Sequence, residues 1–392
     1  MRILLINEFA EGYGAEQIVK DQAKLLSQNG HEVLQLCFGF KLGQKRDAGW
    51  EDDTHIIITS PACFKILFDI VFYRRIRRVV KSFRPDKIIL HNVFSSPMSV
   101  YYACRDYETV QVVHDFKMLC PTSLGILLNK NYARCKGFKD NSCFKCCAKG
   151  TKGYISMLLR FIQMKEGFWF RKRYVGKLLC PSQWLTDITK WYGFHSLKLN
   201  NLTGAAASQN QNVRTPARPN LMSAGGLMFN KGVLRFAEKI LGNHAVSLSI
   251  IGNRGGDDDY RKNTEIASKS NGRISYKGYV DYAQLMEMFS EYSFLVVPSL
   301  CLDNYPTIIL EGMMNKICVI SSDRGGATEL LDDGRGLLFS WDDESSIAKV
   351  IDRITSMSVD EYNSIVDRAY EYVRGNNNFQ VYYDRLNRIL NS

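Results

Sequence analysis

The chain alternates short apolar runs with helix-like segments, and it does so twice. This alternation constrains the possible folds more than any other feature of the sequence. Strands are predicted at 3–7, 32–37, 87–90, 110–113 and 178–180 in the first half, and at 221–224, 246–251, 274–277, 294–297 and 317–321 in the second. Helices are predicted between them at 15–29, 64–83, 184–191, 232–241, 282–291, 307–314 and 344–357. Strands that alternate with helices form parallel sheets covered on both faces. The sequence therefore predicts an α/β protein with two doubly wound domains facing each other across a cleft.

The same pattern sets the expected domain boundaries. With 392 residues, the chain is long enough for two domains of ordinary size. A stretch with little periodicity, rich in small and polar residues, separates the halves, and we expect a linker there at 205–218. The first domain is then expected at 1–204 with an insertion at 120–178, the second at 219–376, and a last helix at 377–392.

Several protein classes are excluded or disfavoured by composition. No run approaches the roughly 18 to 20 uncharged apolar residues of a membrane span. The start has one basic residue and a short apolar run followed by an acid, which favours a first buried strand in a cytosolic protein over a secretory signal. The 11 cysteines are odd in number and mostly lie in apolar segments, which favours thiols in a reducing compartment.

The formal net charge of +11 is confined to two segments. Residues 64–84 carry +6 and residues 148–178 carry +7, so the rest of the chain is slightly acidic. Both segments have helical spacing and are rich in apolar side chains, and the second adds Trp169 with several phenylalanines. Such basic, aromatic helices are typical of an anionic lipid interface. The alternative is two ordinary helices with solvated basic faces. Nucleic acid is not an expected partner, since no signature of a binding module is present.

The segment 298–312 carries the clearest chemical pattern. A strand ends at Pro298 and a helix begins near Thr307, so the first amides of the helix, at Thr307 and Ile308, are predicted to form an anion site. Asp303 lies in the loop and Glu311 lies about one turn into the helix. Carboxylates beside an anion site are suited to accept hydrogen bonds from sugar or ribose hydroxyls. The alternative is a helix with an Asp-Asn cap and an acidic first turn.

This segment resembles the acidic-x7-acidic motif of the family 4 retaining glycosyltransferases, as Asp303-x7-Glu311. Further matches in the same order extend the resemblance over most of the chain. They are Gly12-Tyr13-Gly14-Ala15-Glu16, Val112-Val113-His114-Asp115, Asn230-Lys231-Gly232, Gly278, Pro298-Ser299 and Gly325-Gly326-Ala327-Thr328-Glu329.

The resemblance implies the two-domain GT-B fold, with two Rossmann-like domains, a nucleotide-diphospho-sugar as substrate, no metal or other cofactor, and retention of the anomeric configuration. It also implies that the last helix crosses back to the first domain. By this resemblance, Lys231 binds the diphosphate, and Gly14 lets the first loop come close to it. Glu311 binds the ribose, and Asp303 contacts the transferred sugar. His114 contacts the donor sugar near the reacting carbon. A lysine and helix-terminal amides stabilise the charge that grows on a leaving diphosphate. Taken alone, His114 is equally consistent with a structural histidine that makes its hydrogen bonds at the end of a strand. Lys231 is equally consistent with an ordinary residue at the start of a helix.

One position departs from the family pattern. The family usually has Arg five residues before the lysine, whereas this chain has Gly226. Arg254, in a glycine-rich loop after another predicted strand, is a candidate to replace it in the diphosphate site. The alternatives to such a replacement are that the enzyme is weak or that its donor is held differently.

Two further groups are candidates of a weaker kind. Four cysteines within thirteen residues offer one Cys-x2-Cys pair for zinc, but a second such pair is missing, and a structural role for the loop is the alternative. These cysteines are Cys135, Cys143, Cys146 and Cys147. His91 and Asn92 follow a predicted strand and are expected to line the acceptor side of the cleft.

The sequence therefore predicts a retaining glycosyltransferase of bacterial surface polysaccharide synthesis. The donor would be a UDP- or GDP-sugar held by the second domain, and the acceptor a glycan or lipid-linked glycan held by the first. The protein is expected in the cytoplasm, attached peripherally to the inner face of an anionic membrane. Two alternatives stay open: a sugar-nucleotide epimerase on the same architecture, and a catalytically silent nucleotide-sugar-binding or scaffold protein.

Overall fold

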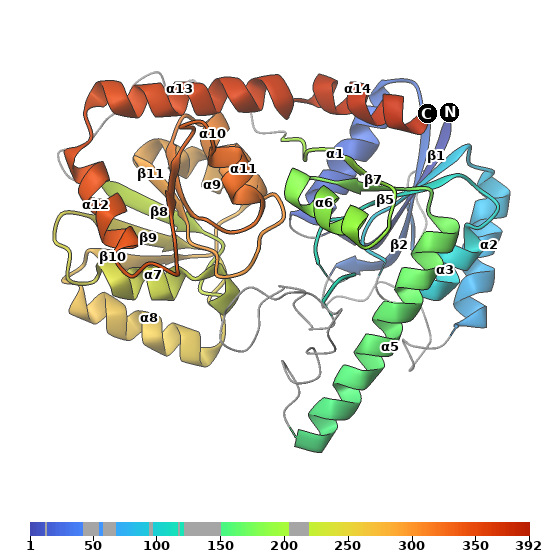
Figure 1. Cartoon of the computed structure of the whole chain (residues 1–392), viewed down its shortest axis with the longest axis horizontal. Helices are drawn as coiled ribbons and strands as arrows, with labels where there is room; N and C mark the ends of the chain where they lie inside the picture. Colours follow the sequence, from blue (N-terminus) through green and yellow to red (C-terminus); the bar gives the residue numbers. More distant parts are fainter. Residues whose placement is uncertain are drawn as a thin grey trace. The chain divides into compact units, whose positions relative to one another are not determined.

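The chain forms two compact units in a computed structural model. The structure describes residues 1–11, 14–41, 55–57, 68–93, 97–116, 118–120, 150–203 and 219–392. The first unit comprises Met1–Leu202 together with Phe379–Ser392, and the second comprises Thr203–Asn378 (Figure 1). Each unit contains one parallel sheet with helices packed against it. The prediction of two doubly wound α/β domains is confirmed.

The first unit is built on a seven-stranded parallel sheet with the order β3-β2-β1-β4-β5-β6-β7. Its strands are β1 (Arg2–Glu11), β2 (Glu32–Lys41), β3 (His55–Ile57), β4 (Lys87–Leu90), β5 (Thr109–Val112), β6 (Lys177–Cys180) and β7 (Ser196–Lys198). Nearly every side chain of β4 and β5 is buried on one face or the other. This explains why these strands are continuous apolar runs rather than alternating ones.

Successive residues of β1 separate the core of this unit into two layers. Ile3 and Leu5 pack with α1 (Ala15–Gln28) and α14 (Phe379–Leu390) on one face of the sheet. Leu4 and Ile6 pack on the opposite face with α2 (Ile70–Phe83), α3 (Pro97–Ala103) and the end of α5 (Gly150–Tyr174). The helix α6 (Gln183–Trp191) joins the last two strands. The alternation follows from the two-residue period of a strand.

The second unit has a six-stranded parallel sheet with the order β10-β9-β8-β11-β12-β13. Its strands are β8 (Asn220–Ala224), β9 (Ser247–Ile251), β10 (Ile274–Gly278), β11 (Phe294–Val297), β12 (Cys318–Ser322) and β13 (Leu337–Phe339). Its helices are α7 (Val233–Ile240), α8 (Asp257–Lys269), α9 (Tyr282–Met288), α10 (Thr307–Met314), α11 (Gly326–Leu331), α12 (Ser346–Ser356) and α13 (Val359–Asn376), with short 3-10 turns at Phe229–Lys231 and Phe289–Glu291.

The strand orders place a topological switch point in each unit. In the first sheet β1 is flanked by β2 and β4, and in the second sheet β8 is flanked by β9 and β11. The connections leave in opposite directions at these strands, and folds of this kind bind ligands beyond the carboxyl ends of the strands at such a point. The predicted site residues after β4, β8 and β11 are therefore at the positions where such folds bind ligands.

Several helices differ from the prediction: α3, α8, α11 and α13 were not predicted, and α2 is shorter than expected. α2 begins at Ile70 instead of residue 64, because Asp69 caps it by accepting a hydrogen bond from the Phe72 amide at 2.9 Å. α8 was not predicted, because its many charged residues leave only Asn263 and Ile266 buried and thus little apolar periodicity. α10 has the predicted bounds.

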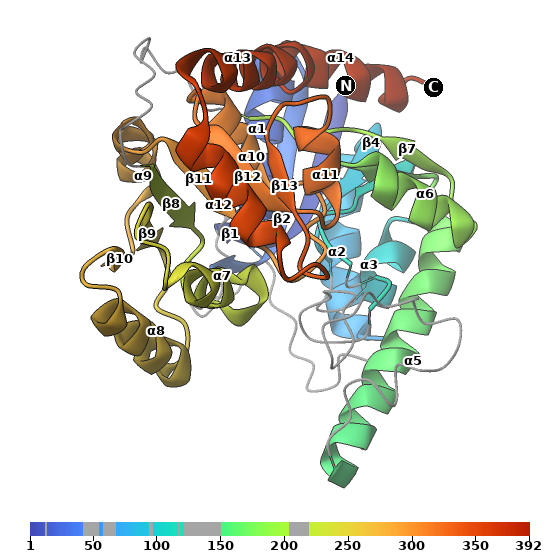
Figure 2. The same cartoon turned by 60° about the vertical axis from the view of Figure 1, so that its left-hand side comes forward.

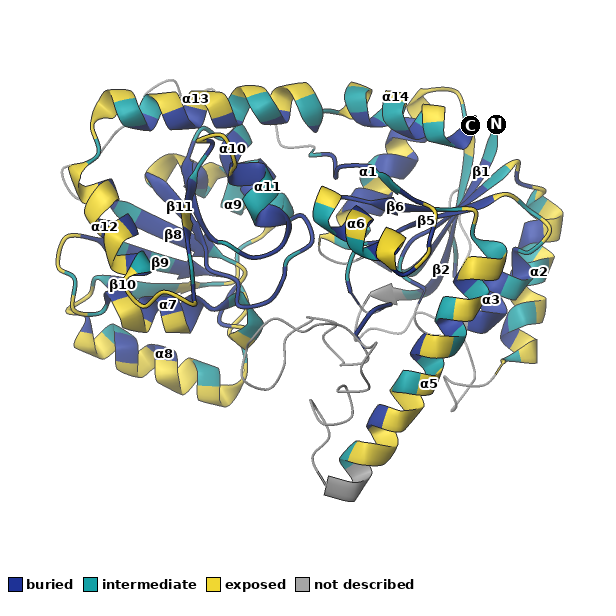
Figure 3. Cartoon of the chain, viewed as in Figure 1, coloured by how far each residue is buried: buried dark blue, intermediate teal, exposed yellow. Residues whose placement is uncertain are grey.

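The surface of α5 is unusual among the helices of the first unit. In two views the beginning of this helix extends away from the sheet (Figures 1 and 2), and exposed residues alternate with covered ones along it (Figure 3). Its exposed large apolar side chains are Tyr154, Ile155, Leu158, Leu159, Ile162 and Trp169. Within the described ranges, no helix combines the length and apolar character that crossing a bilayer requires.

Candidate functional site

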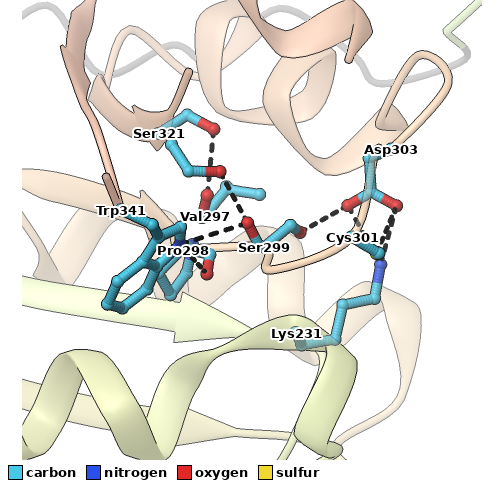
Figure 4. A network of polar contacts seen from close by, with 9 residues as sticks. Lys231, Val297, Pro298, Ser299, Cys301, Asp303, Ser321 and Trp341 are labelled. Carbon is cyan, nitrogen blue, oxygen red and sulfur yellow. Dashed lines mark hydrogen bonds and ion pairs between the residues drawn. The ribbon is translucent and has the colours of Figure 1, made fainter. Parts of the chain in front are cut away.

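The loop after β11 is held in place through its backbone carbonyls. The Trp341 indole N–H lies 3.3 Å from the carbonyl oxygens of both Pro298 and Ser299 (Figure 4). Arg324, which is 2% exposed, donates from Nη1 to the Leu300 carbonyl at 2.7 Å. These donors come from the chain after β12 and β13, so the neighbouring strands fix the shape of the loop.

Asp303 projects from this loop towards Lys231. The Lys231 Nζ atom lies 3.3 Å from both carboxylate oxygens of Asp303, and Ser299 donates its hydroxyl to the Oδ2 atom (Figure 4). The ion pair joins the segment after β8 to the segment after β11, which are the two strands at the switch point. The Asp303 carboxylate raises the pKa of Lys231, so the lysine is cationic at neutral pH. Both side chains are partly exposed, at 35% for Lys231 and 20% for Asp303, so a ligand can reach the pair.

Two glycines permit the backbone of Asp303 to lie where it does. Gly325 has φ of 68°, and a Cβ atom there would stand 2.1 Å from the Asp303 carbonyl oxygen. A Cβ atom on Gly326 would stand 1.9 Å from the carbonyl oxygen of Asn304, and the Gly326 amide donates to the Asp303 carbonyl at 2.7 Å. Any side chain at these positions would displace the loop.

The structure gives a physical reason for the missing arginine at Gly226. This residue has φ of 78°, and a Cβ atom on it would lie 2.1 Å from the Asn253 carbonyl oxygen. The close approach of the two loops leaves no room for a side chain. Arg254, the candidate replacement, is exposed, forms an ion pair with Asp257 and lies with its guanidinium carbon 5.0 Å from the centre of the Tyr260 ring. Its partners are therefore on α8.

The start of α10 supplies the predicted backbone donors. Pro306 is the residue before the first turn, and Thr307 and Ile308 are the first two helical residues. Amides at these positions have no carbonyl partner within their own helix. Glu311 follows one turn later, where burial raises the pKa of its carboxyl to about 7 and a hydrogen bond from Tyr282 of α9 opposes this rise. Near neutral pH, the Glu311 carboxyl therefore exists in both protonation states.

In the first unit, the predicted residues lie beyond the carboxyl ends of β1, β4 and β5. His114 stands two residues after β5 and is half-buried. Its Nε2 atom is 2.8 Å from the Nδ1 atom of His91, which directly follows β4. Gly14 has φ of 42° and precedes α1, with no atom within 4 Å of a Cβ placed on it.

His91 does not line a surface, in contrast to the expectation that it contacts an acceptor. The side chain is 1% exposed, and its two ring nitrogens contact His114 at 2.8 Å and the Gln22 side-chain oxygen at 2.9 Å. Since β4 is a central strand covered on both faces, the residue that follows it remains inside the core. Asn92 is half-buried, and its amide donates to the Asn7 side chain at 3.3 Å.

The structure thus brings together Lys231 with Asp303, and His114 with His91. It does not give Arg254 or Glu311 a contact with the Lys231–Asp303 pair. Trp341, Arg324, Gln22 and Tyr382 were not identified from the sequence, because each acts on residues distant in the chain and no local motif marks it. The cysteine cluster at 135–147 lies outside the described residues. Among the residues that are described, no group of three or more His, Cys, Asp or Glu side chains is placed to hold a metal ion.

Two protein family models match the chain, one in each of its two units. Residues 13–199 match the model described as glycosyltransferase family 4, and residues 218–356 match the model described as glycosyl transferases group 1. Together the two matches cover most of the chain. Among curated protein sequences, none matches it.

Solved structures with a similar fold are numerous but distant in sequence. HepE of Anabaena, solved in complex with UDP, has a TM-score of 0.72 at 14% identity, with 100% of each chain covered. Sucrose-phosphate synthase of Thermosynechococcus elongatus has a TM-score of 0.72 at 14% identity, covering 99% of this chain and 98% of the other. The lipopolysaccharide outer core galactosyltransferase WaaB has a TM-score of 0.63 at 15% identity, with 99% and 98% covered. At these identities, the likeness shows the fold, which is the predicted GT-B fold of two Rossmann-like domains.

Proposed function

Because the chain belongs to the glycosyltransferases, with a family 4 domain followed by a group 1 domain, we propose that it transfers a sugar with retention of configuration from a nucleotide-diphospho-sugar to a glycan or lipid-linked acceptor. The observation that carries the proposal is the partly exposed Lys231–Asp303 pair at the switch point of the second unit. The proposed setting is surface polysaccharide synthesis at the cytoplasmic face of a bacterial membrane.

The proposed donor site lies in the second unit. Lys231 has three N–H donors, and Asp303 takes up two of them at most, so at least one remains for a phosphate oxygen. The amides of Thr307 and Ile308 are suited to the same diphosphate. Glu311 would accept hydrogen bonds from ribose hydroxyls, and Asp303 from the transferred sugar. HepE has been solved with UDP-glucose, which supports a UDP-sugar as the first donor to test.

In the proposed reaction, the bond between the anomeric carbon and the diphosphate breaks, and the acceptor oxygen bonds to the same face of the sugar. The electron pair of the broken bond stays on the leaving diphosphate, where Lys231 and the α10 amides stabilise it. The leaving phosphate oxygen then takes the acceptor hydroxyl proton, so no separate base is needed. His114 would contact the donor sugar near the reacting carbon. No step calls on a metal ion or another cofactor.

The proposed membrane surface consists of the exposed faces of α2 and α5. These helices and α3 cover the same face of the first sheet. The exposed apolar residues of α5 lie beside Arg160, Lys165, Lys172 and Arg173, and α2 adds Arg74, Arg75, Arg78 and Lys81. Aromatic rings and cations on one surface favour a headgroup region with anionic lipids, and such a surface would keep a lipid-linked acceptor near the first unit.

Two binding experiments test the proposal. A thermal-shift screen with UDP-, GDP- and ADP-glucose should identify one donor that stabilises the wild type and does not stabilise Lys231→Ala. The control Lys262→Ala, which removes an exposed lysine paired with Glu238 at 2.9 Å, should respond like the wild type. If no nucleotide sugar binds, the proposed function is wrong. Donor isomerisation without an acceptor would instead indicate an epimerase.

Vesicle sedimentation tests the membrane surface. Wild-type protein should sediment with phosphatidylglycerol vesicles and much less with phosphatidylcholine vesicles. Leu158→Ser with Leu159→Ser should lower the bound fraction, whereas Arg261→Glu with Lys269→Glu on α8 should not. Equal sedimentation of all variants would contradict this surface.

A further inference from the structure

Four side chains in the first unit form a continuous hydrogen-bonded chain. Gln22 of α1 donates from Nε2 to the Tyr382 hydroxyl of α14 at 2.6 Å. The Gln22 Oε1 atom lies 2.9 Å from Nε2 of His91, and Nδ1 of His91 lies 2.8 Å from Nε2 of His114. Three members of the chain are almost completely buried, at 0% exposure for Gln22, 1% for His91 and 3% for Tyr382. His114 is the member that water or a ligand can reach.

The geometry between the imidazoles is that of a hydrogen bond rather than of stacking. The two rings are within 20° of parallel and their centres are 5.2 Å apart. With 2.8 Å between the facing nitrogens, such a separation places the rings edge to edge and nearly in one plane. An N–H group on one ring therefore points along the lone pair on the other.

The hydrogen-bonded chain has a direction. Since Gln22 uses its NH2 group for Tyr382, only its oxygen faces His91, and an amide oxygen can only accept. The proton of His91 is therefore on Nε2. Burial lowers the pKa of His91 well below the usual range and that of His114 to about 4, so both rings are neutral at physiological pH. A neutral His91 with its proton on Nε2 must accept at Nδ1, and so His114 must donate from Nε2.

The side chains around His91 hold its backbone and do not compete for its ring nitrogens. Gln111 of β5 donates to the His91 carbonyl at 3.2 Å, and its own oxygen accepts from Tyr101 at 3.1 Å and from Arg171 at 3.0 Å. These contacts fix the backbone of His91 and leave both of its ring nitrogens to the chain.

We propose that Gln22 and His91 are positioning residues that hold His114 as the tautomer protonated at Nε2, so that its Nδ1 lone pair accepts a hydrogen bond from a hydroxyl group of the sugar substrate. This inference rests on the proposed function for its substrate. It also gives the last helix a role in the site, because the Tyr382 hydroxyl accepts the hydrogen bond from the Gln22 amide nitrogen and so completes the chain of hydrogen bonds. An inverted amide would reverse every bond in the chain and place the proton of His114 on Nδ1.

The direct test is the tautomer of His114 in the full chain. 15N-detected NMR of protein labelled at histidine, assigned with His114→Gln and His91→Gln, distinguishes a protonated from an unprotonated ring nitrogen. The wild type should show His114 protonated at Nε2 and unprotonated at Nδ1. The opposite tautomer would overturn the proposal, whether or not the protein transfers a sugar, so the two failures are distinguishable.

Three substitutions test the positioning role. Gln22→Met and Tyr382→Phe should convert His114 to a mixture of tautomers and lower kcat by at least about tenfold, with the donor KM unchanged within about twofold. Gln22→Glu retains an acceptor facing His91 and should retain the wild-type tautomer of His114. The matched control is Tyr383→Phe, which removes the 3.0 Å contact of the neighbouring tyrosine with His31 and should change neither quantity.

The outcomes separate positioning from mere packing. If Gln22→Met lowers kcat while the tautomer stays as in the wild type, or if Tyr383→Phe lowers kcat as much as Tyr382→Phe, the proposal is wrong. Where a variant does not fold, the wild-type spectrum alone decides the tautomer.

Discussion

The two units share a strand order but carry opposite kinds of chemistry at the same place in the fold. Beyond the switch point of the first sheet lies a buried, neutral chain of hydrogen bonds that ends at His114. Beyond the switch point of the second lies a partly exposed pair of opposite charges, Lys231 and Asp303. Each arrangement suits its environment. A neutral, hydrogen-bonded imidazole loses little free energy on burial, whereas two charged side chains lose their hydration when they are fully buried. The same scaffold therefore positions a neutral hydrogen-bonding group in one unit and a partly exposed ion pair in the other.

The two units also fix their site residues in different ways. His114 is oriented by side chains from α1, α14 and the end of β4. The backbone of Asp303 is fixed by close packing against Gly325 and Gly326, and its carboxylate is held by the side chains of Lys231 and Ser299. We therefore expect substitutions around His114 to affect the chemical step without weakening diphosphate binding, and those around Lys231 and Asp303 to affect donor binding, departure of the diphosphate and stability.

The largest expected effect is that of Lys231→Ala. Removal of this cation leaves the leaving diphosphate without its charged partner, so kcat/KM for the donor should fall by about 10²- to 10³-fold. Calorimetry with the nucleotide sugar would measure the loss of donor affinity, and steady-state kinetics would measure the loss of kcat. Lys262→Ala should retain wild-type values, and an equal loss in that variant would show that the effect is not specific to the site.

His114→Ala should lower kcat by about 10²-fold and leave the affinity for the free nucleoside diphosphate unchanged. The reason is that His114 belongs to the unit without the proposed diphosphate site. Titration of UDP into both variants checks the contrast. A loss of UDP affinity in His114→Ala as large as that in Lys231→Ala would remove the distinction between the two units.

The loss of stability on replacing a glycine by alanine shows how tightly the backbone is packed near the site in each unit. Gly325→Ala adds both a strained φ and a clash with a backbone oxygen, so it should lower the free energy of unfolding by about 2 to 4 kcal/mol. Gly14→Ala meets strain at φ of 42° without a clash and should cost about 1 kcal/mol. Gly242→Ala, with neither feature, is the control. Chemical denaturation measures all three, and equal losses would contradict the account of the Asp303 loop.

The smallest expected effect is on pH dependence. The pKa of Glu311 is raised to about 7. In the proposed site, the ionised carboxylate would accept from both ribose hydroxyls, whereas the protonated acid loses one acceptor oxygen to its own O–H group. Affinity for UDP-glucose should therefore rise about tenfold from pH 6 to pH 8, since one pH unit below the pKa leaves about a tenth of the carboxyl ionised. UDP-glucose is the ligand to use because its phosphates do not titrate in this range. Glu311→Gln should bind weakly and without pH dependence.

The same group gives a stability effect of known sign. Because the pKa of Glu311 in the folded state lies above that of an ordinary glutamate, the unliganded wild type should lose stability as pH rises from about 4.5 to 7. Glu311→Gln should remove that part of the loss. A steeper loss in the variant than in the wild type would contradict the raised pKa.

Much of the fold could be predicted from the sequence, because buried parallel strands are continuous apolar runs. β11 and α10 have the predicted bounds, and the apolar spacing of 307–314 contained the necessary information. α8 could not be predicted in this way, since a helix on the surface with few buried residues carries little periodicity.

The candidate site was predicted less completely. Motifs identified Lys231, Asp303 and His114 as single residues, and the structure adds that the first two form an ion pair. Gln22 and Tyr382 are 360 positions apart, so no local pattern could connect them. The same holds for Gly226, whose role depends on contact with the loop at Asn253.

The most direct test of the account is a crystal structure of the protein with UDP-glucose or a stable analogue of it. The diphosphate should contact Lys231 Nζ and the Thr307 and Ile308 amides, and the ribose hydroxyls should lie at Glu311. A diphosphate bound away from Lys231, or a ribose bound away from Glu311, would contradict it.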